Sequence, residues 1–287
     1  MVPRQQRAML SSTQHHCAVL GKPIAHSLSP VLHRTAYAEL GLDWTYSVHE
    51  VDEAGLAAFV DGVDASWRGL SLTMPLKRAA IPLCDEVDEV ARTVTAVNTL
   101  LLDENGRRRG TNTDVPGMVA ALRERGVDAV ESALLLGVGA TACSAVAALA
   151  SLGARTVMAV ARNAATAGEL RAVAERCGVE VALVSFDDLG SLDAADVAVS
   201  TVPDAASAVV ADTVVKRVGT IFEVLYDPWP TVLAAAGEQA GRTVVGGFDL
   251  LVHQAALQVE LMTERTPAPL AAMRSSGVAA LRARWGK

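Results

Sequence analysis

The chain reads Leu136-Gly137-Val138-Gly139-Ala140-Thr141-Ala142 between a short apolar segment and an alanine-rich one. The apolar segment, residues 133–136, is typical of a buried strand, and residues 141–152 are typical of a helix that ends before a glycine. Gly137 permits a tight turn, and Gly139 lets backbone N–H groups approach a pyrophosphate, which the positive end of the helix dipole attracts. This arrangement predicts a dinucleotide-binding site. A tight turn of purely structural origin is the alternative.

Strand-like and helix-like segments alternate on both sides of this turn, which predicts an α/β fold with largely parallel sheets. Downstream, the pattern is the βαβ series of a doubly wound Rossmann domain, with strands expected at 156–160, 181–184, 197–200 and 221–225. Upstream, strands and one helix indicate a separate α/β domain, and Asn105-Gly106 predicts a hairpin turn. The upstream strands are expected at 17–20, 45–51, 67–73, 97–102 and 108–111, and the helix at 29–40.

A long segment near the end, residues 248–263, is apolar nearly all round, which suits a helix buried between other elements. We expect this helix and the last one to return to the N-terminal domain. The prediction is therefore an N-terminal α/β substrate domain and a C-terminal Rossmann domain. Residues 1–113 plus 248–287 are expected to form the substrate-binding catalytic domain, and residues 114–247 the dinucleotide-binding domain.

Composition limits the classes of partner. The chain has 287 residues, 51% of them hydrophobic, so it can bury a large core. Its net charge of −7 and the lack of a long basic run beyond Arg107-Arg108-Arg109 argue against a nucleic-acid partner.

No stretch of about 18 uncharged apolar residues and no apolar leader is present, so we expect no membrane partner and a cytoplasmic protein. The cysteines, which lack CxxC or CxxH spacing, fit a reducing compartment and predict no metal site: Cys17, Cys84, Cys143 and Cys177.

The choice between NAD and NADP depends on the end of the second Rossmann strand. NAD sites place an acidic residue there, whereas this chain has Arg162 in the equivalent region. Because a guanidinium matches a phosphate group, NADP is favoured. The alternative is a solvated surface arginine, since residues 163–166 add no second basic group.

Two side chains of the N-terminal domain are candidates for acid–base chemistry. Lys77 follows Thr73 by four residues, so if Thr73 caps a helix, both side chains leave one face of its first turn. A lysine beside the positive end of a helix dipole costs stability, which favours a functional role over a solvated surface lysine. Asp114 precedes Val115-Pro116 and is expected to be an N-cap at the junction of the two domains. It could pair with Lys77 across a cleft there, or be only structural.

Five motifs in register resemble those of the shikimate dehydrogenase family, from about residue 17 to the C-terminus. Residues 21–30 resemble its G-x-P-I-x-H-S-x-S-P, and residues 72–77 its V-T-x-P-x-K. Residues 97–99 resemble its V-N-T, residues 112–114 its D-N-T-D, and residues 253–255 its x-Q-A. This order is a far more specific signal than one glycine-rich turn.

The resemblance implies a role for each matching residue. The catalytic pair would be Lys77 and Asp114. Substrate contacts would lie at Ser27, Ser29, Thr73, Asn98, Tyr226 and Gln254. Cofactor contacts would lie at Gly137, Val138, Gly139, Ala140, Thr141, Arg162, Thr201, Val224 and Gly247. The implied reaction is the NADP-linked interconversion of 3-dehydroshikimate and shikimate in aromatic amino acid (chorismate) biosynthesis, by a monomer or homodimer.

Several interpretations stay open at this point. Taken singly, Ser29 could be a helix cap, Ser27 a turn residue, Asn98 a strand-end residue and Tyr226 a packing residue. The chain also departs from the family pattern, with Ser71 where many members have asparagine and Ala161 ahead of the arginine. The alternative functions are an NAD-dependent quinate/shikimate dehydrogenase and a non-catalytic dinucleotide-sensing module. The intact lysine and aspartate argue against the sensing module.

Overall fold

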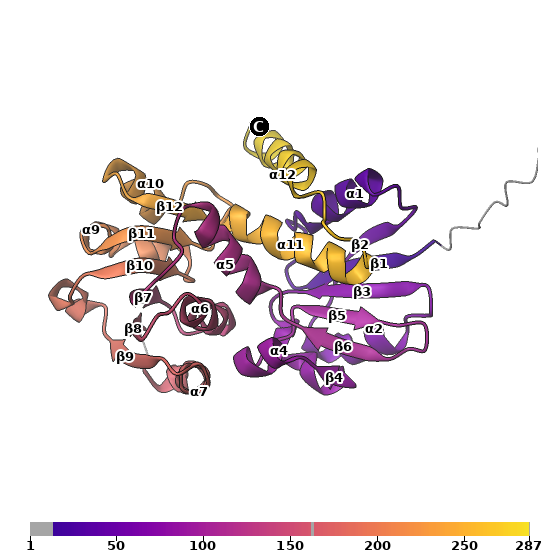
Figure 1. The fold of residues 1–287 in the computed structure, drawn as a ribbon, viewed down its shortest axis with the longest axis horizontal. Helices are drawn as coiled ribbons and strands as arrows, with labels where there is room; N and C mark the ends of the chain where they lie inside the picture. Colours follow the sequence, from indigo (N-terminus) through magenta and orange to yellow (C-terminus); the bar gives the residue numbers. More distant parts are fainter. Residues whose placement is uncertain (1–13, 162–163, 287) are drawn as a thin grey trace, which may run out of the picture.

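A computed structural model of the chain describes residues 14–161 and 164–286. This part forms two six-stranded sheets, each flanked by helices, in two lobes that lie side by side (Figure 1). The N-terminal lobe contains β1 to β6, and the C-terminal lobe contains β7 to β12. The predicted α/β class, with an N-terminal α/β domain followed by a Rossmann domain, is confirmed.

The N-terminal sheet has the strand order β2-β1-β3-β5-β6-β4. β1 lies parallel to β2 and β3, whereas β5 is antiparallel to both β3 and β6. The predicted hairpin between β5 and β6 is present, and Gly106 adopts the positive φ of +77° that its turn requires. The strands are β1 (His16–Gly21), β2 (Thr45–Glu50), β3 (Trp67–Leu72), β4 (Glu86–Val87), β5 (Thr99–Leu102) and β6 (Arg108–Thr111). The helices of this lobe are α1 (Ser29–Glu39), α2 (Glu53–Asp61), α3 (Leu76–Ala79) and α4 (Glu89–Val94).

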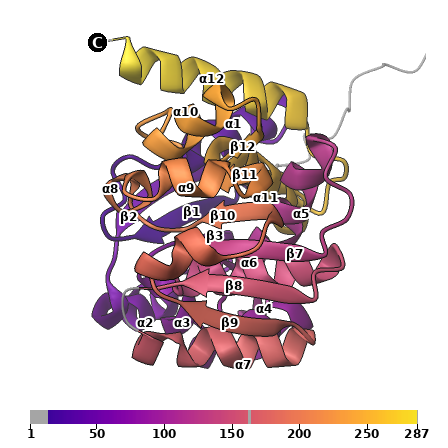
Figure 2. The same cartoon turned by 90° about the vertical axis from the view of Figure 1, so that its left-hand side faces the viewer.

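The C-terminal sheet is parallel throughout, with the order β12-β11-β10-β7-β8-β9. Figure 2 shows β10, β7, β8 and β9 side by side in this sheet. The order reverses between β7 and β10, the switch point at which open α/β sheets bind ligands beyond the carboxyl ends of their strands. The strands are β7 (Ser132–Leu136), β8 (Thr156–Val160), β9 (Glu180–Val184), β10 (Ala195–Ser200), β11 (Val218–Glu223) and β12 (Thr243–Gly246). The helices are α5 (Asp114–Glu124), α6 (Ala140–Ser151), α7 (Gly168–Cys177), α8 (Asp204–Ala208), α9 (Ala211–Val215) and α10 (Val232–Gln239).

The last two helices return to the N-terminal lobe, as predicted. α11 (Gly247–Thr263) leaves β12, packs against α5, and continues onto α1 and β3 (Figure 1). Its buried residues lie on most of its circumference, which explains the apolar composition of the segment. α12 (Leu270–Trp285) then packs against α1. α11 thus extends as one helix from the end of the C-terminal sheet to the N-terminal sheet.

Two predicted helix starts are wrong. Thr73 does not cap a helix: α3 begins at Leu76, whose N–H donates to the backbone carbonyl of Thr73, and its N-cap Pro75 offers no side-chain acceptor. Asp114 is not an N-cap either, because it is the first residue of α5. The side chain of Asn112 takes the capping role and accepts hydrogen bonds from the N–H groups of Asp114 and Val115, at 2.9 and 3.3 Å. The Asp114 carboxylate is therefore not used for capping.

No helix in the ranges that the structure describes has the length and hydropathy needed to cross a lipid bilayer. The four cysteines, all within these ranges, are free thiols.

Candidate active site

A cavity of about 310 Å³ brings together the residues that the motifs predicted for substrate and catalysis. Its wall includes the ends of β1 and β3, the start of α5 and one face of α11. Two residues predicted for the cofactor, Val224 and Gly247, also line it. The predicted residues in its wall are Ser27, Ser29, Thr73, Lys77, Asn98, Asp114, Tyr226 and Gln254.

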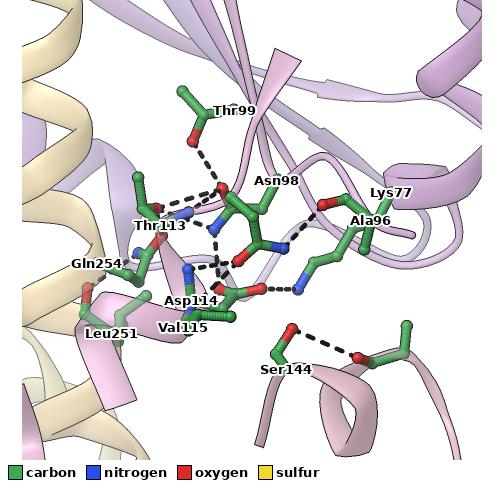
Figure 3. Close-up of polar contacts among 12 residues, drawn as sticks. Lys77, Ala96, Asn98, Thr99, Thr113, Asp114, Val115, Ser144, Leu251 and Gln254 are labelled. Atoms are coloured by element: carbon green, nitrogen blue, oxygen red, sulfur yellow. Dashed lines mark hydrogen bonds and ion pairs between the residues drawn. The ribbon is translucent and has the colours of Figure 1, made fainter. Parts of the chain in front are cut away.

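Lys77 and Asp114 meet in this wall (Figure 3). Lys77 comes from α3 and Asp114 from the first residue of α5, and Lys77 Nζ lies 2.7 Å from Asp114 Oδ2. Their side chains are only 16% and 10% exposed. Since an ammonium group has three N–H donors and this contact uses one, Lys77 can also donate to an acceptor in the cavity. The contact makes a charge-assisted hydrogen bond, the strong kind.

Asn98 holds the second oxygen of this carboxylate. Its Nδ2 donates to Asp114 Oδ1 at 2.9 Å, and its Oδ1 accepts from the backbone N–H of Thr113 at 2.8 Å (Figure 3). Asn98 is itself only 2% exposed and follows the buried segment that leads into β5. Both carboxylate oxygens of Asp114 thus have a donor, which fixes the plane of the carboxylate relative to the lysine.

Hydroxyl groups occupy another part of the cavity wall. Ser27 lies in the loop after β1, and its Oγ accepts a hydrogen bond from the N–H of Ser29 at 3.3 Å, which leaves its O–H free to donate. Tyr226 lies in the loop after β11, and burial raises the pKa of its phenol, which therefore keeps its proton. Donors of this kind suit a carboxylate ligand.

Thr73 and Gln254 complete the polar lining. Thr73 follows β3, and Gln254 lies on α11, where its Nε2 donates to Leu251 O at 2.9 Å. Its Oε1 accepts from Thr113 Oγ1 at 3.4 Å. An amide has two N–H donors, so Gln254 keeps one for a ligand hydroxyl.

The glycine-rich turn has the geometry that a pyrophosphate requires. Gly137 has a φ of +106°, and a Cβ added to it would lie 2.4 Å from Thr201 Oγ1. A Cβ on Gly139 would meet no heavy atom within 4 Å, so this face of the turn is open. α6 begins at Ala140 with no side-chain cap, which leaves its first N–H groups for a ligand. The turn therefore fits a dinucleotide, with Val138 and Thr141 beside these glycines.

The remaining cofactor predictions lie around the turn and the cavity. Thr201 follows β10, and its Oγ1 donates to Leu136 O at 2.9 Å, next to the turn. Gly247 begins α11 against Val224, and a Cβ there would lie 2.0 Å from Val224 O. Arg162, predicted to select NADP, lies outside the described residues.

Sequence reasoning missed Gln258, which also lines the cavity and is 1% exposed. It lies one helical turn after Gln254 on α11, and residues four apart share a helix face. The four-residue spacing from Gln254 was the one feature of the sequence that indicated a place for Gln258 in the cavity wall. Asn112 and Thr113 belonged to a predicted motif, but their part in holding Asp114 was not predicted.

Two family models match the chain, one over most of the N-terminal lobe and one over α11 and the first part of α12. The description "Shikimate dehydrogenase substrate binding domain" matches residues 19–100, and "Shikimate 5'-dehydrogenase C-terminal domain" matches residues 247–276. A curated relative from Methanothermobacter thermautotrophicus, named shikimate dehydrogenase (NADP(+)), is 32% identical over 280 residues, which is 93% of this chain and 97% of the relative. The chain belongs to the shikimate dehydrogenase family.

Solved structures of shikimate dehydrogenases have the same fold. The Mycobacterium tuberculosis enzyme is 42% identical, with a TM-score of 0.86 over 92% of this chain and 99% of that one. The Thermus thermophilus enzyme in complex with NADP(H) and shikimate is 30% identical, with a TM-score of 0.81 over 93% of this chain and all of that one, 100%. The motifs found in the sequence therefore belong to a family whose members share both lobes.

Proposed function

We propose that this protein is an NADP-dependent shikimate dehydrogenase, which interconverts 3-dehydroshikimate and shikimate in aromatic amino acid biosynthesis. The observation that carries the proposal is the 2.7 Å contact of Lys77 and Asp114 in the wall of a polar cavity. A proton donor and hydroxyl donors for a carboxylate are what a small hydroxy- or keto-acid substrate requires. The relatives that bear this name support the reaction and the cofactor.

The cavity residues divide between the two ends of such a substrate. Ser27, Ser29 and Tyr226 would bind its carboxylate through their hydroxyl groups. Thr73, Asn98 and Gln254 would bind the ring hydroxyls next to the reacting carbon. Together these groups orient a flat ring with its reacting carbon toward the lysine and the dinucleotide site.

In the reduction, NADPH held at the glycine-rich turn of Gly137 and Gly139 would supply the hydride for the keto carbon. The C=O π-bond breaks as the new C–H bond forms, and Lys77 Nζ transfers a proton to the oxygen, which becomes the hydroxyl group. Asp114 accepts from both Lys77 and Asn98 and so holds the ammonium in line. In the reverse direction Lys77 is the base that accepts the hydroxyl proton. Closure of the lobes would exclude water during this step.

The cofactor site would extend from the glycine-rich turn to Val224 and Gly247, with Arg162 beside the 2′-phosphate. Residues 114–247 would form this cofactor domain, and residues 1–113 plus 248–287 the substrate domain. The free thiols favour a cytoplasmic protein. A monomer or a homodimer remains our expectation for its assembly.

A matrix of steady-state rates tests the proposal. Shikimate and quinate are each oxidised with NADP and with NAD by the purified protein. We expect the highest kcat/KM with shikimate and NADP. Higher kcat/KM with NAD and quinate would favour the quinate/shikimate alternative, and binding of both ligands without turnover would favour the sensing module.

A further inference from the structure

A buried hydrogen-bond network in the N-terminal lobe adjoins the catalytic pair through Asn98. Its centre is the side-chain amide of Gln258, which joins α11 to α1, β3 and β5. Gln258 Oε1 accepts from Ser71 Oγ at 2.8 Å and contacts His33 Nε2 at 3.3 Å. Gln258 Nε2 donates to Thr99 Oγ1 at 2.9 Å and to Asn98 O at 3.2 Å. All four hydrogen-bonding positions of the amide are therefore in use.

The direction of each hydrogen bond on the His33 side is determined. Since Oε1 can only accept, both Ser71 and His33 donate to it, and His33 carries its proton on Nε2. The other ring nitrogen, Nδ1, lies 3.4 Å from Tyr37 Oη and accepts from it. Burial lowers the pKa of His33 to about 3, so the ring stays neutral. Ser71, having donated to Gln258, accepts from Tyr46 Oη at 2.6 Å.

The hydrogen bonds between Gln258 and the catalytic pair also have defined directions. Thr99 Oγ1 accepts from Gln258 and donates to Asn98 Oδ1 at 2.8 Å, since an amide oxygen can only accept. Asn98 Oδ1 also accepts from the backbone N–H of Thr113, which can only donate. The amide of Asn98 is thus held with its oxygen toward Thr99 and its Nδ2 toward Asp114. In the opposite orientation, the Asn98 oxygen would face the carboxylate.

We propose that Gln258 is a positioning residue, which orients the Asn98 amide through Thr99 and so holds the Asp114 carboxylate against Lys77. The inference rests on the proposed function, because it concerns the same catalytic pair. Gln258 acts through other residues and is not itself in contact with Lys77. Its hydrogen bonds also couple α11, which crosses between the lobes, to Asn98 and to the first residue of β5, Thr99.

The first test is Gln258→Met, which keeps the length of the side chain and removes its donors and acceptor. We expect kcat for shikimate oxidation to fall by about tenfold or more, because small displacements of catalytic groups are costly, while KM changes less. Thr263→Val is the matched control, since it removes another buried hydrogen bond of α11, from Thr263 Oγ1 to Val259 O at 2.7 Å. The control should lower the melting temperature and leave kcat unchanged.

The second test is Gln258→Glu, which is nearly isosteric and distinguishes positioning from stability. When protonated, the new carboxyl group can donate to Thr99 and preserve the direction of the network. When ionised, it cannot donate, so Thr99 would turn toward it and release Asn98. We expect kcat to decrease with rising pH as this carboxyl group ionises, a step that the wild-type profile lacks.

The wild-type groups that face residue 258 do not titrate in a way that would give the new step in the pH profile. In the wild type, burial lowers the pKa of His33 and raises the pKa of both Tyr37 and Tyr46, so none of the three titrates near neutrality. Lys77 and Asp114 lie beyond Asn98 and are present in both proteins, so the wild-type profile already contains their effect. A new ionisation in the variant therefore comes from the carboxyl group at residue 258, by itself or coupled to the His33 imidazole that contacts it.

Two results would overturn the inference while the wild type remains active. One is a folded Gln258→Met variant with kcat within about twofold of the wild type or of Thr263→Val. The other is a Gln258→Glu variant whose pH profile matches that of the wild type. Failure of the proposed function would appear differently, as a wild-type protein that does not oxidise shikimate with NADP.

Discussion

At the scale of single residues, Asn112 caps α5 and so leaves the carboxylate of Asp114 available for the catalytic pair. Its Oδ1 accepts from the first N–H groups of α5, and its Nδ2 donates to Ala96 O at 2.8 Å. The helix is thereby capped from outside, and Asp114 can use both carboxylate oxygens for Lys77 and Asn98. A capping aspartate would instead have directed one oxygen to the backbone.

We predict that Asn112→Ala lowers both stability and activity. Loss of the cap should reduce the free energy of unfolding by about 1–2 kcal/mol, measured by urea denaturation. It should also lower kcat, because Asp114 loses its fixed backbone position. Asp52→Ala is the control, since the half-exposed Asp52 caps α2 through Gly55 N at 3.1 Å and otherwise pairs, among the described residues, only with Lys22 on the surface. Equal kcat in the two variants would contradict the role given to Asn112.

The residues that the motifs predicted were found together, whereas the network behind them was not predicted. The residues of a family's motifs contact the same ligand. The motifs therefore predicted that Ser27 and Gln254 lie in one cavity, although they are far apart in the sequence. Gln258 belongs to none of the motifs, and only its four-residue spacing from Gln254 indicated that it lies on the same helix face. Its partners Ser71 and Thr99 come from strands distant in the sequence, and local patterns do not report such pairings.

At the scale of elements, the segment after β11 is held by a buried glutamate at the end of that strand. Glu223 Oε1 accepts from Leu225 N at 3.1 Å, and Oε2 accepts from Thr231 Oγ1 at 3.2 Å. Thr231 is in turn the N-cap of α10. The two ends of the loop that carries Tyr226 are therefore joined through one carboxyl group. Burial raises the pKa of Glu223 from 4.5 to about 7.

This pKa predicts a pH dependence of stability with a definite sign. Between about pH 4.5 and 7 the folded state holds a proton on Glu223 that the unfolded chain has lost. The free energy of unfolding therefore falls as pH rises, by about 1.4 kcal/mol per pH unit from this group, and the loss is complete above pH 7.

The neutral variant Glu223→Gln should lack this contribution. Relative to the wild type, we expect the variant to gain stability from pH 5 to pH 7 in thermal or urea unfolding. Glu180→Gln, the same change at an exposed position of β9, provides the comparison. If the wild type and Glu223→Gln show parallel stability curves across this pH range, Glu223 is not protonated in the folded protein near neutrality.

Local chemistry predicted the elements near the glycine-rich turn well and the helix starts poorly. The strand, turn and helix around residues 136–142 are specified by glycines and an apolar run within one window. α3 and α5 begin elsewhere than predicted. Pro75, and not Thr73, precedes α3, and the side chain of Asn112, and not that of Asp114, accepts from the first N–H groups of α5. The short β4 and the strand order of the N-terminal sheet depend on non-local pairing, which propensity does not encode.

At the scale of the whole molecule, the cavity depends on contacts between the two lobes at its rim. Arg284 on α12 donates to His26 O at 3.1 Å and to Asp227 Oδ2 at 2.6 Å. His26 lines the cavity from the N-terminal lobe, and Asp227 follows Tyr226 on the C-terminal lobe. The arginine therefore connects the two sides of the cavity in this arrangement.

We predict that Arg284→Ala raises KM for shikimate more than it lowers kcat. Without the bridge, the arrangement that forms the complete cavity should be less populated, and apparent affinity falls by that fraction. A partly exposed ion pair is worth up to about 1 kcal/mol, so KM should rise by no more than about fivefold. Arg107→Ala is the control, because its ion pair with Glu86 lies away from the cavity. Equal KM values for both variants would exclude a role for the bridge.

The central claim is that Lys77 transfers the proton at the reacting oxygen, and replacing Lys77 by alanine tests it most directly. We would measure kcat and KM for shikimate oxidation with NADP in Lys77→Ala and in Arg78→Ala, whose side chain instead pairs with Glu169 at 2.8 Å. We predict that Lys77→Ala lowers kcat by about a hundred- to ten-thousandfold with a much smaller change in KM, and that Arg78→Ala keeps kcat near the wild-type value. A folded Lys77→Ala protein that retains near-wild-type kcat would contradict the account.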